Sequence, residues 1–130
     1  MRLLIVLDTL ENLRRGGRAA AFIAVADRMA RALNIKVMIN VVEGQLRLLG
    51  AARSFKSAVG RVLTTVEQLG PLDQLAVLHT RSQEVAEQVA AELAQRVGFP
   101  REEIWVRETG VVLATHAGPR VIAVLAAPRR

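Results

Sequence analysis

The stretch LAVLHTRSQEVAEQVAAELAQRVGFPREEIWVR, residues 75–107, contains the clearest secondary-structure signals in the chain. Short apolar runs at 75–78 and 104–107 are typical of buried strands. Between them, aliphatic residues recur at every fourth position: Val85, Val89, Leu93 and Val97. This spacing places them on one side of an amphipathic helix. The stretch therefore predicts a strand, a helix and a second strand in that order.

Both ends of this helix carry signals of their own. Thr80 and Gln83 have the spacing of a capping box, in which two side chains bond free backbone N–H groups at the start of a helix. Gly98 is the residue type that most readily adopts the left-handed conformation at a helix end, and Pro100 prevents continuation. We therefore expect the helix to begin just after Thr80 and to end at Gly98.

The other apolar segments extend this pattern over the whole chain. Residues 3–7 and 121–125 are predicted strands, and residues 36–49 predict a hairpin that turns at Glu43-Gly44. A further amphipathic helix is expected at 54–69, a short helix after Asp8 that stops at Gly16-Gly17, and another helix from about residue 19 to residue 33. Strands alternate with helices, but one strand pair is a hairpin. We therefore predict a single α/β domain over 1–130, of the two-layer α+β type, with a mixed β-sheet covered mainly on one face by helices.

Composition narrows the function classes. The 130 residues include no cysteine, which excludes disulfides, thiolate nucleophiles and thiolate metal sites. No apolar run approaches the roughly 20 residues of a membrane span, so we expect a cytoplasmic protein. The formal net charge is +6, but the basic residues are spread along the chain and aromatic residues are few. We interpret the charge as a solvated surface or as a docking face for an acidic protein, with nucleic-acid binding as an alternative.

The segment between the last two predicted strands gathers groups suited to an anion. Thr115 offers a short hydroxyl donor, and His116 offers a donor that can also carry charge. Gly110 and Gly118 allow backbone amides to approach a ligand closely. A loop of this composition is also common as a plain turn, so both interpretations stay open at this point.

A second anion-binding candidate is the run LRRGGR at 13–18. A glycine pair between two predicted helices directs the N-terminus of the second helix and several guanidinium groups, including that of Arg18, toward one region. Helix N-termini and arginine side chains both favour anions. The same pattern also occurs in simple helix turns. It supports an anion-binding site only when it is taken together with the first candidate.

Four ordered motifs of the chain resemble those of one known protein family. DTLENLRRGGR at 8–18 resembles the family's DTLEYLKKGGRI, and LNIKV at 33–37 with the later Gly44 resembles LNIKPILxxxDG. AVLH at 76–79 resembles the end of the family's AIVHAD strand, and GVVLATHAGPR at 110–120 resembles GxxxxTHTGPG. Order and spacing agree over nearly the whole chain, which therefore resembles the DegV family of fatty-acid-binding proteins. The departures from the pattern are Val37, Ala117 and Arg120.

This resemblance implies a function that composition does not show. Members of the family have two domains, bind a long-chain fatty acid between them and, in several bacteria, present it to a separate fatty acid kinase. The chain resembles the C-terminal domain, with residues 1–18 resembling the crossover from an N-terminal domain. Two sets of residues match family positions: His116, Thr115 and Arg18 near the fatty-acid head group, and Arg53 and Lys56 in the stretch that resembles a kinase-docking surface.

Other function classes are less well supported. The sequence has no nucleophile elbow, P-loop or paired carboxylates, so we expect no catalytic residue, no metal and no cofactor. The alternatives are a basic nucleic-acid-binding domain, or a structural or interaction domain that has lost lipid binding. Because one domain would supply only half of the family's site, we expect a homo-oligomer or a separate N-terminal domain. His79 is expected to cap its strand, and Trp105 to lie in the core or at a sheet edge.

Overall fold

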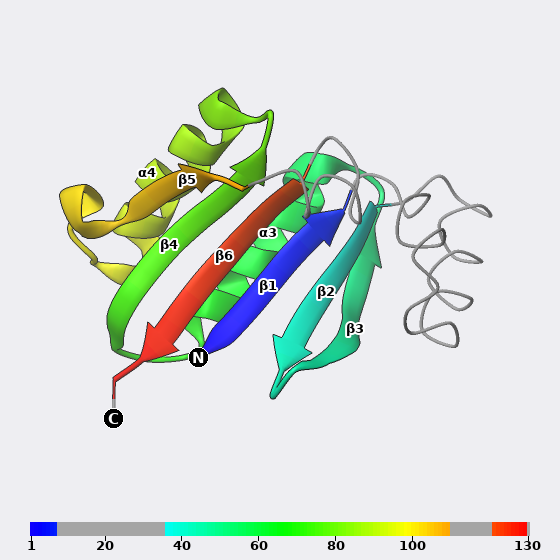
Figure 1. Ribbon diagram of the computed structural model, residues 1–130, viewed down its shortest axis with the longest axis horizontal. Helices are drawn as coiled ribbons and strands as arrows, with labels where there is room; N and C mark the ends of the chain where they lie inside the picture. The colour runs from blue at the N-terminus through cyan, green and yellow to red at the C-terminus, as the bar shows by residue number, and fades with distance from the viewer. Residues whose placement is uncertain (8–35, 110–120, 130) are drawn as a thin grey trace.

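The computed structural model describes residues 1–7, 36–109 and 121–129. Within these ranges the chain forms a six-stranded sheet with the order β3-β2-β1-β6-β4-β5 (Figure 1). Neighbouring strands are antiparallel except β4 and β5, which are parallel, so the sheet is mixed as predicted. The strands are β1 (Arg2–Leu7), β2 (Lys36–Val42), β3 (Gln45–Ala52), β4 (Leu72–Thr80), β5 (Trp105–Glu108) and β6 (Val121–Pro128).

The predicted hairpin is formed by β2 and β3. Val42 lies opposite Gln45, which leaves Glu43 and Gly44 as a two-residue turn. Both turn residues have positive φ angles, 51° and 78°, as the tight turn of a twisted hairpin requires. β3 continues to Ala52, beyond the expected end, and forms one edge of the sheet.

Two helices are described, and both follow the predicted apolar spacing. α3 (Phe55–Glu67) begins where the Ser54 hydroxyl oxygen accepts the backbone N–H of Ser57 at 3.0 Å. α4 (Gln83–Val97) ends at Gly98, which has the expected left-handed conformation with a φ of 68°. The buried side chains of the two helices are Ala58, Val59, Val62, Leu63, Val66, Ala86, Val89, Ala90 and Leu93.

The start of α4 differs from the predicted capping box. The N-cap residue is Ser82, and its side chain makes no capping bond to the helix. Thr80 is the last residue of β4, and its hydroxyl oxygen accepts the backbone N–H of Val121 at 3.1 Å. Gln83 bonds the ring of His79 at 2.9 Å. The capping prediction was wrong because Thr80 has a partner that is distant in sequence, which local spacing cannot reveal.

The sheet has two apolar faces, because successive strand residues point to opposite sides. We call the side covered by α3 and α4 the helix face; Figure 1 shows both helices behind the sheet. We call the opposite side the second face. Its cluster consists of buried Ile5, Val37, Ile39, Val121 and Ala123, with Leu3, Val41, Leu46, Leu48 and Leu78 partly buried around them. The two described helices thus lie on one face, as the predicted fold class requires.

Candidate functional site

The predicted head-group residues all lie outside the described residues: Arg18, Gly110, Thr115, His116 and Gly118. The structure does show where the two segments that carry them join the sheet. The first segment, residues 8–35, follows Leu7, and the second, residues 110–120, precedes Val121. Leu7 pairs with Val37 on β2 and with Val121 on β6. Thr109 precedes the second segment and donates its backbone N–H to the carbonyl oxygen of His79 at 2.8 Å. Both segments therefore join the sheet at one end, which we call the Val121 end.

From the Val121 end, an apolar row runs along β6 on the second face. By the alternation of strand residues, the row consists of Val121, Ala123, Leu125 and Ala127. Val121 and Ala123 are 0% and 1% exposed, whereas Leu125 and Ala127 are only partly buried. At about 3.3 Å per residue, the row is about 20 Å long. Two of its four residues are alanine, and both lie opposite larger residues: Ala123 opposite Ile5 and Leu78, and Ala127 opposite Gln74.

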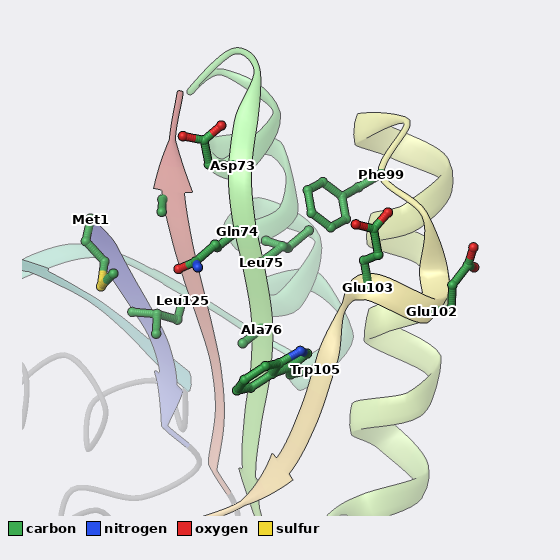
Figure 2. A pocket seen from close by; sticks show the side chains of 11 residues that line it. Met1, Asp73, Gln74, Leu75, Ala76, Phe99, Glu102, Glu103, Trp105 and Leu125 are labelled. Carbon is green, nitrogen blue, oxygen red and sulfur yellow. The ribbon is translucent and has the colours of Figure 1, made fainter. Parts of the chain in front are cut away.

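At the other end of this row lies a pocket of about 460 Å³, where β4 extends beyond the start of β5 (Figure 2). Met1 and Trp105 line it, and at 75% and 63% exposure they are the exposed large hydrophobic residues of the described chain. The Trp105 position confirms a sheet edge. The remaining lining residues are Asp73, Gln74, Leu75, Ala76, Phe99, Glu102, Glu103, Leu125 and Ala127.

Sequence reasoning did not find this pocket, because its walls come from three strands (β4, β5 and β6), the 3-10 helix η1 (Arg101–Glu103), and the separate residues Met1 and Phe99. Its strongest sequence signal was Trp105, the only tryptophan of the chain. The guanidinium of Arg107 lies 5.3 Å from the centre of the Trp105 ring, within the range of a cation–π contact. The side of the indole toward Arg107 is therefore occupied, while much of the ring stays accessible.

The two predicted docking residues are described, and both are exposed. Arg53 and Lys56 lie on either side of Ser54, the N-cap of α3, whose first turn contains no acidic residue. Positive side chains at a helix N-terminus add to the positive end of the helix dipole. Ala52, the residue before Arg53, pairs with Lys36 at the start of β2. The helix α3 therefore also begins at the Val121 end of the sheet.

Arg61, on α3, is a third cation. Its Nη1 donates to the carbonyl oxygen of Ala51 at 2.9 Å. The guanidinium lies against Gly50, where a β-carbon would come within 2.8 Å of Nη2. We call Arg53, Lys56 and Arg61 the basic surface. Sequence reasoning missed Arg61 because its contact depends on β3 continuing past Leu49.

His79 is fully buried at the end of β4. One ring nitrogen accepts the N–H of Ser82 at 3.1 Å, and the other lies 2.9 Å from the side-chain oxygen of Gln83. The prediction that His79 caps its strand is therefore confirmed. Within the described ranges, no cluster of His, Cys, Asp and Glu is suited to hold a metal ion. Nor does any described helix have the length and apolar character to cross a membrane.

The sequence and the fold of the chain both match those of one known family. The sequence model of the DegV family, which carries the description "uncharacterised protein, DegV family", matches residues 1–129. The chain therefore belongs to the DegV family. A DegV domain-containing protein of Deinococcus radiodurans is 35% identical over 129 residues, covering 94% of this chain and 42% of that protein. A second relative, the DegV domain-containing protein SCO2569 of Streptomyces coelicolor, is 32% identical over 127 residues, and the match covers 95% of this chain and 43% of that protein.

Solved structures of the family have the same fold. The fatty acid binding DegV family protein SAG1342 of Streptococcus agalactiae superposes with a TM-score of 0.78 at 28% identity, covering 99% of this chain and 45% of that one. The Fak B3 protein of Streptococcus pneumoniae, solved with linoleic acid, gives a TM-score of 0.83 at 21% identity, covering 98% and 44%. The chain thus spans less than half the length of these proteins.

Proposed function

We propose that this chain binds one long-chain fatty acid, with the carboxylate at the Val121 end and the acyl chain along the second face. The observation that carries the proposal is the apolar row on β6, which connects the attachment points of both family motifs to the pocket at Trp105. A row of about 20 Å suits an extended long acyl chain better than a short acid. Each methylene removed from water contributes about 0.8 kcal/mol, so this contact would supply most of the affinity.

The carboxylate would need donors once it leaves water, because an unpaired buried charge is costly. In this proposal His116, Thr115 and Arg18 donate to it, and Gly110 and Gly118 let the backbone approach. The segments carrying these residues are attached on neighbouring strands, through Leu7, Val121 and Thr109. That common attachment supports a single head-group site.

The basic surface would then serve a partner. Three strand spacings of about 4.8 Å separate β3 from β6, so the start of α3 lies about 14 Å across the sheet from the start of β6. A fatty acid kinase docked on Arg53 and Lys56 would be close to the exposed carboxylate. The chain itself would act as a binding protein in the cytoplasm, not as an enzyme, and would need no cofactor.

A further unit would complete the protein. The relatives are more than twice as long as the matched region, which covers 42% of the Deinococcus radiodurans protein. We propose that an N-terminal domain or a second copy of this chain packs against it. The exposed Met1 and Trp105 favour such a contact, because large apolar side chains left in water commonly mark an interface.

Native mass spectrometry of the purified chain, before and after addition of oleate, tests the proposal. We expect a mass increase of one fatty acid per chain, together with dimers or higher species at tens of micromolar protein. Protein that takes up no oleate but is retained on DNA in a salt-dependent way would contradict the proposal and support the nucleic-acid alternative.

A further inference from the structure

His79 and Thr80, at the end of β4, are the buried polar residues of the described chain, with exposures of 0% and 1%. Polar side chains this deeply buried are costly unless they are hydrogen-bonded, and both are. Their bonds leave the strand in two directions, toward α4 and toward the two ends of segment 110–120.

The imidazole of His79 is fixed by the first turn of α4. Ser82 donates its backbone N–H to Nδ1 at 3.1 Å, so the proton of the neutral ring lies on Nε2. Nε2 then donates to the side-chain oxygen of Gln83 at 2.9 Å. The amide nitrogen of Gln83 donates in turn to Glu87 at 2.7 Å.

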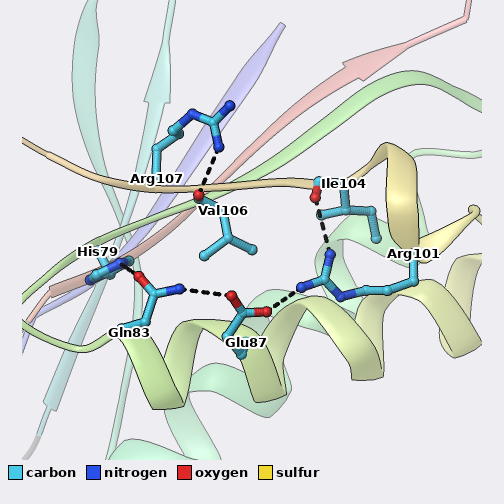
Figure 3. A network of polar contacts seen from close by, with 7 residues as sticks. All are labelled: His79, Gln83, Glu87, Arg101, Ile104, Val106 and Arg107. Atoms are coloured by element: carbon cyan, nitrogen blue, oxygen red, sulfur yellow. Dashed lines mark hydrogen bonds and ion pairs between the residues drawn. The ribbon is translucent and has the colours of Figure 1, made fainter.

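Figure 3 shows that this chain of contacts continues along one side of α4. Glu87 forms an ion pair with Arg101, and Nη1 of Arg101 donates to the carbonyl oxygen of Ile104 at 3.2 Å. The end of β4 is thereby tied through α4 to the residue before β5. His79 thus has little freedom to shift relative to the helix and to β5.

The same two residues bond both ends of segment 110–120. The carbonyl oxygen of His79 accepts the backbone N–H of Thr109 at 2.8 Å and its hydroxyl at 3.2 Å. The hydroxyl oxygen of Thr80 accepts the backbone N–H of Val121 at 3.1 Å. Consecutive residues of one strand therefore fix the residue before the segment and the residue after it.

We infer that His79 and Thr80 are positioning residues for fatty-acid binding: they set the separation and direction of Thr109 and Val121, the residues on either side of the segment that carries Thr115 and His116. This inference rests on the proposed function. Fixing both ends of a connecting segment lowers the conformational entropy that ligand binding has to offset, which raises affinity without any direct contact. Neither residue needs to touch the fatty acid.

The experiment compares Thr80→Val, which removes the hydroxyl, with Thr80→Ser, which restores it. Oleate affinity and hydrogen exchange of the Val121 amide in ligand-free protein are measured in each full-length variant. We expect Thr80→Val to bind oleate about tenfold more weakly and to exchange the Val121 amide faster, while Thr80→Ser stays within about twofold of wild type.

Two controls separate positioning from general stability. Val66→Ala removes core volume on the helix face, where Val66 is fully buried, and should destabilise the fold without changing oleate affinity. Thr65→Val removes a hydroxyl that bonds only within α3, to the carbonyl oxygen of Arg61 at 3.0 Å. It should leave both readouts unchanged.

A second variant covers the case in which Thr80→Val does not fold. Gln83→Ala removes the acceptor of His79 Nε2 from an exposed helix position, and it should weaken oleate binding about threefold to fivefold. If wild type binds oleate and both Thr80→Val and Gln83→Ala bind it equally well, the positioning inference is wrong and the proposed function stands. If wild type binds no oleate, the proposed function fails, and the inference fails with it.

Discussion

The two faces of the sheet differ in how they are closed. On the helix face, Leu4, Val77 and Leu93 are fully buried in one continuous cluster beneath α3 and α4. On the second face, burial is complete near Val121 but declines along β6 until Trp105 is 63% exposed. Both faces are apolar, so hydrophobicity alone does not separate them.

From this difference we propose that the two faces serve different purposes. A face sealed by its own helices stabilises the fold, because every side chain there is removed from water in the folded chain. A face whose apolar row ends in an open pocket gains less from folding and more from an added apolar molecule. We therefore expect substitutions on the helix face to change stability and substitutions on the second face to change ligand affinity.

The largest effect is expected from Leu93→Ala on the helix face. Leu93 is fully buried between α4 and the sheet, and removal of its side chain leaves a cavity. The loss should be about 2–5 kcal/mol in the free energy of unfolding, measured by chemical denaturation. Oleate affinity at a temperature where the variant is folded should match wild type. A parallel loss of affinity would show that the two faces are not separate in function.

The next effect is expected in the proposed head-group segment. His116→Ala should weaken oleate binding about tenfold to hundredfold, because a hydrogen bond to a charged group contributes about 1.5–3 kcal/mol. Displacement of a fluorescent fatty acid measures the affinity, and an unchanged affinity in His116→Ala would mean that the loop is a structural turn.

A chain-length effect is expected at the far end of the second face. Ala127→Phe fills part of the pocket with a side chain from β6. Oleate should lose about tenfold in affinity, because two or so methylenes lose their contacts at about 0.8 kcal/mol each. Decanoate, which is too short to reach the pocket, serves as the internal control and should bind the variant as it binds wild type. Equal losses for both acids would place the chain end elsewhere.

The smallest effect on stability is expected at the basic surface, which belongs to neither face. Reversal of Arg53 and Lys56 to Glu should change the free energy of unfolding by less than about 1 kcal/mol, because both residues are exposed. The same reversal should weaken binding to a fatty acid kinase severalfold or more, measured by titration calorimetry at low salt. Arg47→Glu with Arg107→Glu makes the same change in net charge at other exposed positions and should leave the complex intact.

Local patterns were sufficient for most of the fold. The apolar spacing in α3 and α4, the Glu43-Gly44 turn and the stop at Gly98 are all short-range features, and all were confirmed. The capping box at Thr80 failed because Val121, its partner, lies on another strand. Thr80 illustrates the general limit: spacing along the chain identifies the element to which a residue belongs but not the distant group it bonds.

The same limit applies to the candidate site. The resemblance to the DegV family predicted which residues bind the head group, and the described residues then added where their segments join the sheet. The pocket at Met1 and Trp105 could not have been predicted, because its walls are assembled from β4, β5, β6 and the residue before β1. Neither could Arg61, whose contact with Ala51 depends on how β3 meets α3.

Fluorescence of Trp105 tests the central claim most directly, because it is the single tryptophan and lines the pocket where the acyl chain is proposed to end. Addition of oleate should shift its emission to shorter wavelength and saturate at one fatty acid per chain, whereas decanoate should bind with little shift. If native mass spectrometry shows bound oleate while the emission of Trp105 stays unchanged, the acyl chain does not follow the second face, and the account of the site is wrong.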